Sequence, residues 1–342
     1  MVRLNSTELE KPTITERVVN VFPGPYLVKC LLFWAIFGTP GMVLTRYLDT
    51  FSVDKALAIF DQVAPLNIAI FSMANFVMPL YGFYGIRKMR LKIVETLPKI
   101  EPLAVRGSKS VRDFFALVRK PMPAIALTVG FGALSILSFP GQVQHVAGIL
   151  SAIIKVIGFV FASLSYGTFI WIYVSSIVGI YRLSNEPLNF VSFLEDRYLG
   201  MKPFGFISLT FAWVYFLGLG LVFFSSNPLP IYLLATLLGL VLLGIVIFLL
   251  PLWTIHVKMI VGKQAAEEAH RKQVSQVIKA LNSKKGDGKV IAKVLISQMI
   301  EQKVSKISEW PFDTVTLGWF SAIVITVLGS IITRYVIAFV GL

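Results

Sequence analysis

Seven apolar segments, each long enough to cross a lipid bilayer, constrain the fold of this chain more than any other feature. A helix needs about 20 apolar residues to cross roughly 30 Å of hydrocarbon. Backbone groups inside lipid must find their hydrogen-bond partners within the protein, so such segments are helices. The sequence therefore predicts an all-α integral membrane protein. The segments are residues 26–45, 65–84, 123–140, 146–173, 206–224, 229–251 and 317–339.

The fourth segment allows two interpretations, because the sequence stays apolar from Val146 to Tyr181. It could form one helix of ~54 Å at 1.5 Å per residue, or two short spans. No Pro or polar turn interrupts it. Gly158 and Gly167 are isolated and are tolerated inside a membrane helix. One long helix is the favoured interpretation.

The positive charge is distributed unevenly along the chain. All but four of the 32 Lys and Arg residues lie in residues 1–29, 85–120, 182–202 and 258–313. Membrane insertion keeps Lys and Arg on the cytoplasmic side. Basic and neutral connections alternate strictly only if the fourth segment crosses once. We therefore predict seven spans in the plasma membrane, with the amino terminus inside and the carboxyl terminus outside.

This topology divides the chain into four parts. Residues 1–25 form a cytoplasmic N-terminal segment. Residues 26–257 contain the first six spans and a cytoplasmic loop at residues 85–121. Residues 258–313 form a cytoplasmic helical hairpin, and residues 314–342 contain the last span.

The predicted hairpin has an apolar stripe on each of its two helices. The stripes have the i, i+3, i+4, i+7 spacing of one helix face, and a turn signal at residues 283–288 separates them. The stripes could pack on each other within a solvated spacer, or they could form a contact between subunits. The interface candidates are Val274, Val277, Ile278, Leu281, Ile296, Ile300, Val304 and Ile307.

The last span carries hydroxyl groups at helical spacing, on Thr326, Ser330 and Thr333, beside Gly329. Hydroxyl groups on one stripe can line a wet pathway, where they replace part of the hydration of an ion. They can also let helices approach closely and hydrogen-bond to each other. The three residues are candidates for lining a pore, and helix packing is the alternative.

Lys155 is the ionisable residue placed well within a predicted span. A charge near the middle of a bilayer is costly, which makes Lys155 a candidate functional residue. The alternative is that its long side chain reaches back to the outer interface.

The sequence patterns do not indicate an enzyme. The chain contains no glycine-rich phosphate loop, nucleophile elbow or His-Glu-x-x-His motif. It has one cysteine, Cys30, and three histidines far apart in sequence, so no metal-ligand spacing is present. We expect no enzymatic activity, no cofactor and no metal.

The net charge of +14 raises the question of a nucleic-acid partner. The basic residues flank apolar spans and do not form a recognition pattern, so no nucleic acid is expected. Basic loops facing anionic lipid headgroups explain the charge more simply. The expected partners are the lipid bilayer, further copies of the chain, and an ion or small ligand that the sequence does not identify.

Three motifs in the second half of the chain carry a family resemblance. They are Glu-Asp-Arg-Tyr-Leu-Gly-Met-Lys-Pro at residues 195–203, Leu-Pro-Leu-Trp-x-x-His at residues 250–256, and Trp-Pro-Phe-Asp at residues 310–313. Together they resemble a family of uncharacterised prokaryotic multi-pass membrane proteins. The resemblance implies a membrane location and transfers no activity.

The predicted architecture also resembles the seven-transmembrane ion channel superfamily of insect odorant and gustatory receptors. The likeness rests on seven spans, an inside amino terminus, a long fourth helix and a cytoplasmic extension before the last span. In that superfamily four subunits meet through the cytoplasmic helices, and the last span lines a cation pore. The Thr-Tyr…Gln-Phe signature of those receptors is absent here. Likeness of shape does not establish function.

The leading hypothesis is a homo-oligomeric, tetrameric ion channel with the last spans around the pore. A secondary transporter is the second hypothesis, although no internal repeat or acid–base relay supports it. A structural or sensor membrane protein without permeation is the third.

Overall fold

The computed structural model describes residues 11–38, 65–105, 107–138, 149–225, 231–283 and 288–340. Helices dominate these parts of the chain, and no strand occurs in them. The α-helices are α1 (Ile14–Val19), α2 (Tyr26–Phe37), α5 (Pro65–Ile100), α6 (Ser108–Phe115), α7 (Pro121–Ser138), α9 (Ile149–Asn185), α10 (Lys202–Ser225), α11 (Ile231–Ser283), α12 (Gly288–Ser305) and α13 (Thr314–Val340). Two short 3-10 helices, η2 (Glu101–Leu103) and η3 (Ala116–Arg119), flank α6.

Five helical stretches of the described chain are long and apolar enough to cross a membrane, which is consistent with a multi-pass membrane protein. They are Val111–Leu134, Val156–Asn185, Lys202–Leu221, Leu237–Gln276 and Thr314–Thr333. The second predicted span lies within α5. The first begins with the 12 residues of α2, and residues 39–45 of it lie outside the described residues.

The prediction of one long fourth helix is confirmed. α9 is a continuous helix of 37 residues. It packs against α7, α5 and α11. At Gly167 a Cβ atom would lie 2.6 Å from the backbone nitrogen of Thr128, so α7 can approach α9 this closely only because the residue is glycine.

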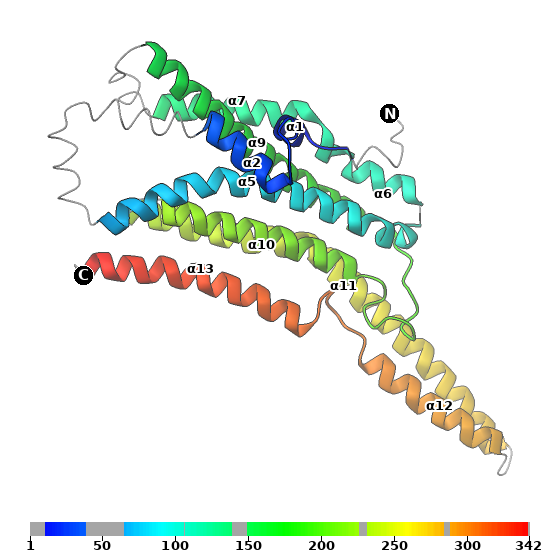
Figure 1. Ribbon diagram of the computed structural model, residues 1–342. Coiled ribbons are helices and arrows are strands. Elements are labelled where there is room, and N and C mark those ends of the chain that lie inside the picture. Colours follow the sequence, from blue (N-terminus) through cyan, green and yellow to red (C-terminus); the bar gives the residue numbers. More distant parts are fainter. Residues whose placement is uncertain are drawn as a thin grey trace.

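The helices pack side by side in layers (Figure 1). α10 lies between α5 and α13 and also contacts α11. The largest buried cluster runs through these helices and includes Ile86, Phe204, Phe211 and Phe248. α13 contacts α10 and α11 and forms an edge of the bundle.

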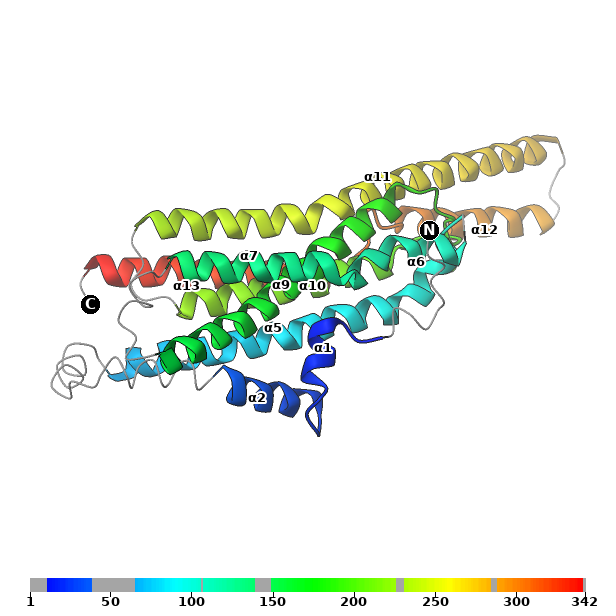
Figure 2. The ribbon, with the colours of Figure 1, turned by 90° about the horizontal axis from the view of Figure 1, so that it is seen from above.

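α11 continues far beyond the bundle. Its 53 residues measure about 80 Å at 1.5 Å per residue, more than twice the hydrocarbon thickness. α12 runs back along it and completes an antiparallel hairpin at one end of the molecule (Figure 2). Pro251 lies inside α11, where it cannot donate to the carbonyl of Ile247.

Candidate functional site

The three motifs that carry the family resemblance meet in space. We name this place the motif junction: residues 195–203 before and at the start of α10, residues 250–256 of α11, and residues 310–313 between α12 and α13. The backbone nitrogen of Ser308 donates to the carbonyl of Arg197 at 2.9 Å. A Cβ atom on Gly205 would lie 2.2 Å from the carbonyl oxygen of Pro311. The start of α10 therefore packs backbone to backbone against the segment that leads into α13.

The first motif forms a tight turn held by an aspartate. Asp196 accepts hydrogen bonds from the backbone nitrogens of Tyr198 and Gly200, each at 2.9 Å. Leu199 and Gly200 both have positive φ angles, 54° and 83°. A left-handed conformation is costly for a leucine, so the surrounding contacts must compensate for it. The side chain of Leu199 is buried in a cluster with Val304 and Ile307 of the hairpin.

The second and third motifs are joined by a stack of aromatic rings. The rings of His256 and Trp310 stack at 4.0 Å with an interplanar angle of 12°. His256 Nδ1 donates to the carbonyl of Glu309 at 2.6 Å. The stack continues from Trp310 to Phe312, whose ring centroid lies 5.4 Å away. Phe248 of α11 then stacks on Phe320 of α13 at 4.2 Å. Aromatic packing therefore links α11 to the beginning of α13.

Ion pairs surround the junction on its exposed side. Lys263 Nζ lies 2.8 Å from Glu309 Oε1, and Lys202 Nζ lies 3.9 Å from Asp313 Oδ2. The hydrogen bond from Lys263, together with the lysine charge, lowers the pKa of Glu309. The hydrogen bonds from Thr316 lower the pKa of Asp313, and the charge of Lys202 adds to this. Asp313 precedes α13 and accepts from the backbone nitrogen of Thr316 at 2.8 Å, as an N-cap residue does.

The predicted pore-lining hydroxyls lie on α13, on the side that the rest of the chain leaves largely uncovered. Thr326 and Thr333 are exposed, and Ser330 is half-buried. Thr326 Oγ1 donates to the carbonyl of Ala322, and Ser330 Oγ donates to the carbonyl of Thr326, each at 2.8 Å. These local bonds use the hydroxyl hydrogens, so the oxygen lone pairs remain available to accept. The opposite side of α13 packs on the bundle through Phe320, Val324 and Ile331.

The hairpin places the interface candidates in two environments. Val304 and Ile307 are buried within the chain, and Ile300 packs against them. Ile278 and Ile296 are exposed over 51% and 56% of their surface, while Val274 is half-buried. Leu295 and Met299, which the sequence interpretation left out, are exposed as well. The side chains of Val277 and Leu281 lie outside the described residues.

Lys155 lies within α9, but its side chain is outside the described part of the structure. Cys30 is buried. Among the described residues, no group of three His, Cys, Asp or Glu side chains could hold a metal ion. A small cavity of about 10 Å³ between α9, α10 and α11 is lined by Ser208 and Pro251 among others. It is too small for an organic ligand.

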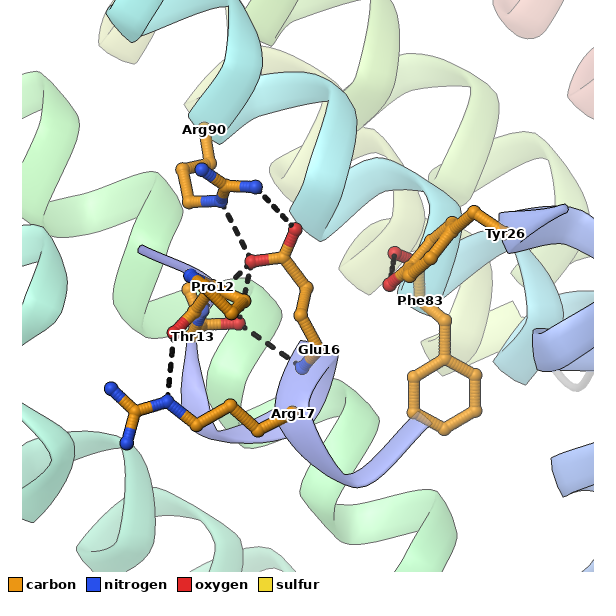
Figure 3. A network of polar contacts seen from close by, with 7 residues as sticks. All are labelled: Pro12, Thr13, Glu16, Arg17, Tyr26, Phe83 and Arg90. Atoms are coloured by element: carbon orange, nitrogen blue, oxygen red, sulfur yellow. Dashed lines mark hydrogen bonds and ion pairs between the residues drawn. The ribbon is translucent and has the colours of Figure 1, made fainter. Parts of the chain in front are cut away.

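Sequence reasoning missed a buried ion pair that attaches the N-terminal segment to the bundle. Glu16 of α1 accepts two hydrogen bonds from Arg90 of α5, from Nε to Oε2 at 2.7 Å and from Nη2 to Oε1 at 2.9 Å (Figure 3). The side chains are 1% and 9% exposed. Thr13 and Glu16 form a capping box at the start of α1. The Thr-x-x-Glu spacing of that box was the local signal in the sequence.

Aromatic side chains complete this attachment. Phe33 of α2 lies edge-on to Phe83 of α5 at 5.4 Å and to Phe161 of α9 at 5.0 Å. Thr15 of α1 shares a hydrogen bond with Thr168 of α9 at 2.6 Å. The N-terminal helices are thus packed against the bundle by charge, hydroxyl and ring contacts together.

No protein-family model, no curated protein and no solved structure matches the chain.

Proposed function

We propose that the protein is a homo-oligomeric, channel-like membrane protein in which the α13 helices of several copies surround an ion pathway. The observation that carries this proposal is the position of α13. It lies at the edge of the bundle, and its outward side carries a stripe of small residues and hydroxyls between larger apolar side chains such as Trp319 and Ile325. Gly318, Ala322, Thr326, Gly329 and Thr333 are all exposed and follow one another at helical spacing. Small residues let a second helix approach closely, and hydroxyl oxygens can coordinate a cation.

The proposed topology has seven spans with the amino terminus inside. The basic stretches before α6, before α10 and in the hairpin gather at one end of the bundle (Figure 1). The backbone bonds from Asn189 to Leu103 and from Ser308 to Arg197 hold these stretches together there. Positive charge concentrated at one end supports a cytoplasmic location for that end.

The hairpin supports an assembly of several copies. Ile278, Leu295, Ile296 and Met299 expose apolar side chains on a part of the chain that extends beyond the spans. Exposed apolar residues on a polar extension favour contact with another protein surface. The resemblance to the insect receptor superfamily suggests a tetramer. In this arrangement, the motif junction would transmit movement of the hairpin to α13 through the His256–Trp310 stack.

The test combines cross-linking with current recordings. Thr326→Cys in a Cys30→Ala background should form disulfide-linked dimers on oxidation, because the outward side of α13 faces another copy. Val324→Cys is the matched control, since Val324 is 8% exposed and faces the bundle of its own chain. Purified protein should pass ions across a planar bilayer, and Thr326→Trp should block the current. A monomer in detergent that is silent in bilayers would refute the proposal.

The remaining hypotheses give different results in the same experiments. A secondary transporter should show saturable uptake driven by an ion gradient, and Lys155→Ala should abolish it. A structural or sensor protein should show neither current nor uptake, even if it forms oligomers.

A further inference from the structure

A row of lysines and aromatic rings lies along the contact between α5 and α10. Lys88 and Lys92 of α5 are one helical turn apart, and Lys202 begins α10. Lys88 Nζ lies 5.5 Å from the centre of the Trp213 ring and 5.7 Å from that of Tyr84. Lys92 Nζ lies 5.9 Å from the Phe206 ring, and Lys202 Nζ lies 5.3 Å from the same ring. Cations and ring faces thus alternate from the motif junction toward the apolar part of α10.

A hollow lies at the end of this row that contains Lys88 and Trp213. Its volume is about 170 Å³, and Lys88, Leu209, Thr210 and Trp213 line it. Lys88 is exposed and forms no ion pair with a described residue. Lys92 differs, because it pairs with Glu95 at 3.2 Å. Lys88 therefore lines the hollow with its ammonium group near two ring faces and, among the described residues, beside no carboxylate.

The surroundings of the hollow are apolar and belong to a candidate membrane span, Lys202–Leu221. Phe206, Trp213 and Leu217 each expose about two-fifths of their surface on the same side of α10. An unpaired lysine is costly in such a place unless it reaches polar headgroups or a counter-ion. A tryptophan beside it is typical of the level at which headgroups meet hydrocarbon.

We propose that this hollow binds the phosphate headgroup of an anionic phospholipid, with Lys88 as its principal counter-ion and an acyl chain along Trp213 and Leu217. Lys92 and Lys202 lie farther along the row, and each is beside a carboxylate, Glu95 and Asp313, so Lys88 carries the unpaired charge. The hydroxyl of Thr210 donates to the carbonyl of Phe206 at 2.8 Å, so Thr210 borders the hollow without offering a free donor to the phosphate. A lipid fits better than a soluble phosphate, because the hollow adjoins exposed apolar side chains.

The test uses full-length protein reconstituted in phosphatidylcholine vesicles that contain increasing fractions of phosphatidylglycerol with brominated chains. Bromine quenches nearby tryptophan fluorescence, and the difference between wild type and Trp213→Phe isolates the signal of Trp213. Wild type should prefer phosphatidylglycerol over phosphatidylcholine by about fivefold, the value of one added charge contact at a membrane surface. Lys88→Gln should remove this preference, so that the two lipids bind about equally well. Lys88→Arg should retain the preference.

Lys99→Gln is the matched control, because Lys99 lies on α5, is well exposed and is remote from the hollow. It should keep the wild-type preference. If Lys88→Gln and Lys99→Gln lose the preference for phosphatidylglycerol equally, the preference comes from general surface charge and the proposal is overturned. An unchanged preference in Lys88→Gln would overturn it as well. Millimolar inorganic phosphate should not restore Trp213 fluorescence. Full restoration would assign the hollow to a soluble phosphate and overturn the lipid assignment. Quenching by brominated phosphatidylcholine alone checks that each variant is folded in the membrane.

Discussion

The N-terminal segment and the motif junction both attach a peripheral part of the chain to the bundle, and both use a carboxylate paired with a cation. The two pairs have almost the same length, 2.7 Å for Arg90–Glu16 and 2.8 Å for Lys263–Glu309. Their surroundings differ. The side chains of the first pair are 9% and 1% exposed, and those of the second are 22% and 48% exposed. Burial, and not distance, separates the two contacts.

This difference decides what each pair contributes. Water surrounds the exposed pair and screens it, so its net contribution is small. The buried pair has lost its hydration, and each charge depends on the other and on nearby donors. The motif junction compensates with the ring stack of His256, Trp310 and Phe312. The N-terminal segment thus adds a buried charge pair to its ring and hydroxyl contacts, whereas the junction depends mainly on apolar contact.

Breaking the buried pair should have the largest effect. Arg90→Leu leaves Glu16 buried without its cation and should lower the free energy of unfolding by about 3–5 kcal/mol. Titration of the detergent-solubilised protein with a denaturing detergent measures this change. Glu95→Gln is the control on the same helix, because Glu95 is 57% exposed, and it should change the value little.

A double variant sharpens this prediction. Glu16→Leu combined with Arg90→Leu should recover part of the loss, because an apolar pair no longer leaves an uncompensated charge. A single Arg90→Leu variant as stable as wild type would show that the ion pair does not hold the N-terminal segment in place.

Removing a ring from the junction should have an intermediate effect. Trp310→Ala deletes the stacking with His256 and Phe312 and should cost about 2 kcal/mol, less than for a fully buried tryptophan. The matched control is Trp319→Ala, since Trp319 is 66% exposed on α13. Thermal unfolding followed by circular dichroism compares the two. Equal effects of both substitutions would contradict the importance given to the stack.

The helices could be predicted from the sequence because their signals are local. The long apolar run predicted α9, the apolar stripes at helical spacing predicted the helices of the hairpin, and the charge pattern along the chain suggested the topology. The side of α13 that faces outward was not predictable, because a membrane helix is apolar on all sides and its neighbours decide which side packs.

The contacts between distant segments were also out of reach. Glu16 and Arg90 are 74 residues apart, and only the capping box of α1 was visible in the sequence. The three motifs were recognisable one by one, but their meeting depends on how α10 and α11 pack. The alignment of Lys88 with Trp213 depends on the register of α5 against α10 in the same way.

The exposed pair gives the smallest effect and the clearest dependence on pH. The hydrogen bond from Lys263 lowers the pKa of Glu309 below its ordinary value of 4.5. A carboxyl group with a lowered pKa contributes stability above its unfolded-state pKa and loses it as the pH falls through the folded-state pKa. Glu309→Gln should therefore cost at most about 0.5 kcal/mol at pH 7, because the pair is exposed.

Unfolding titrations at neutral pH and at a pH below the folded-state pKa should show the difference between variant and wild type disappearing in acid. High salt at neutral pH should reduce it too, since salt screens exposed charges. A larger loss that persists in acid would contradict the prediction, because it could not come from the charge of Glu309; the bond from His256 goes to the backbone carbonyl of residue 309, which the variant keeps.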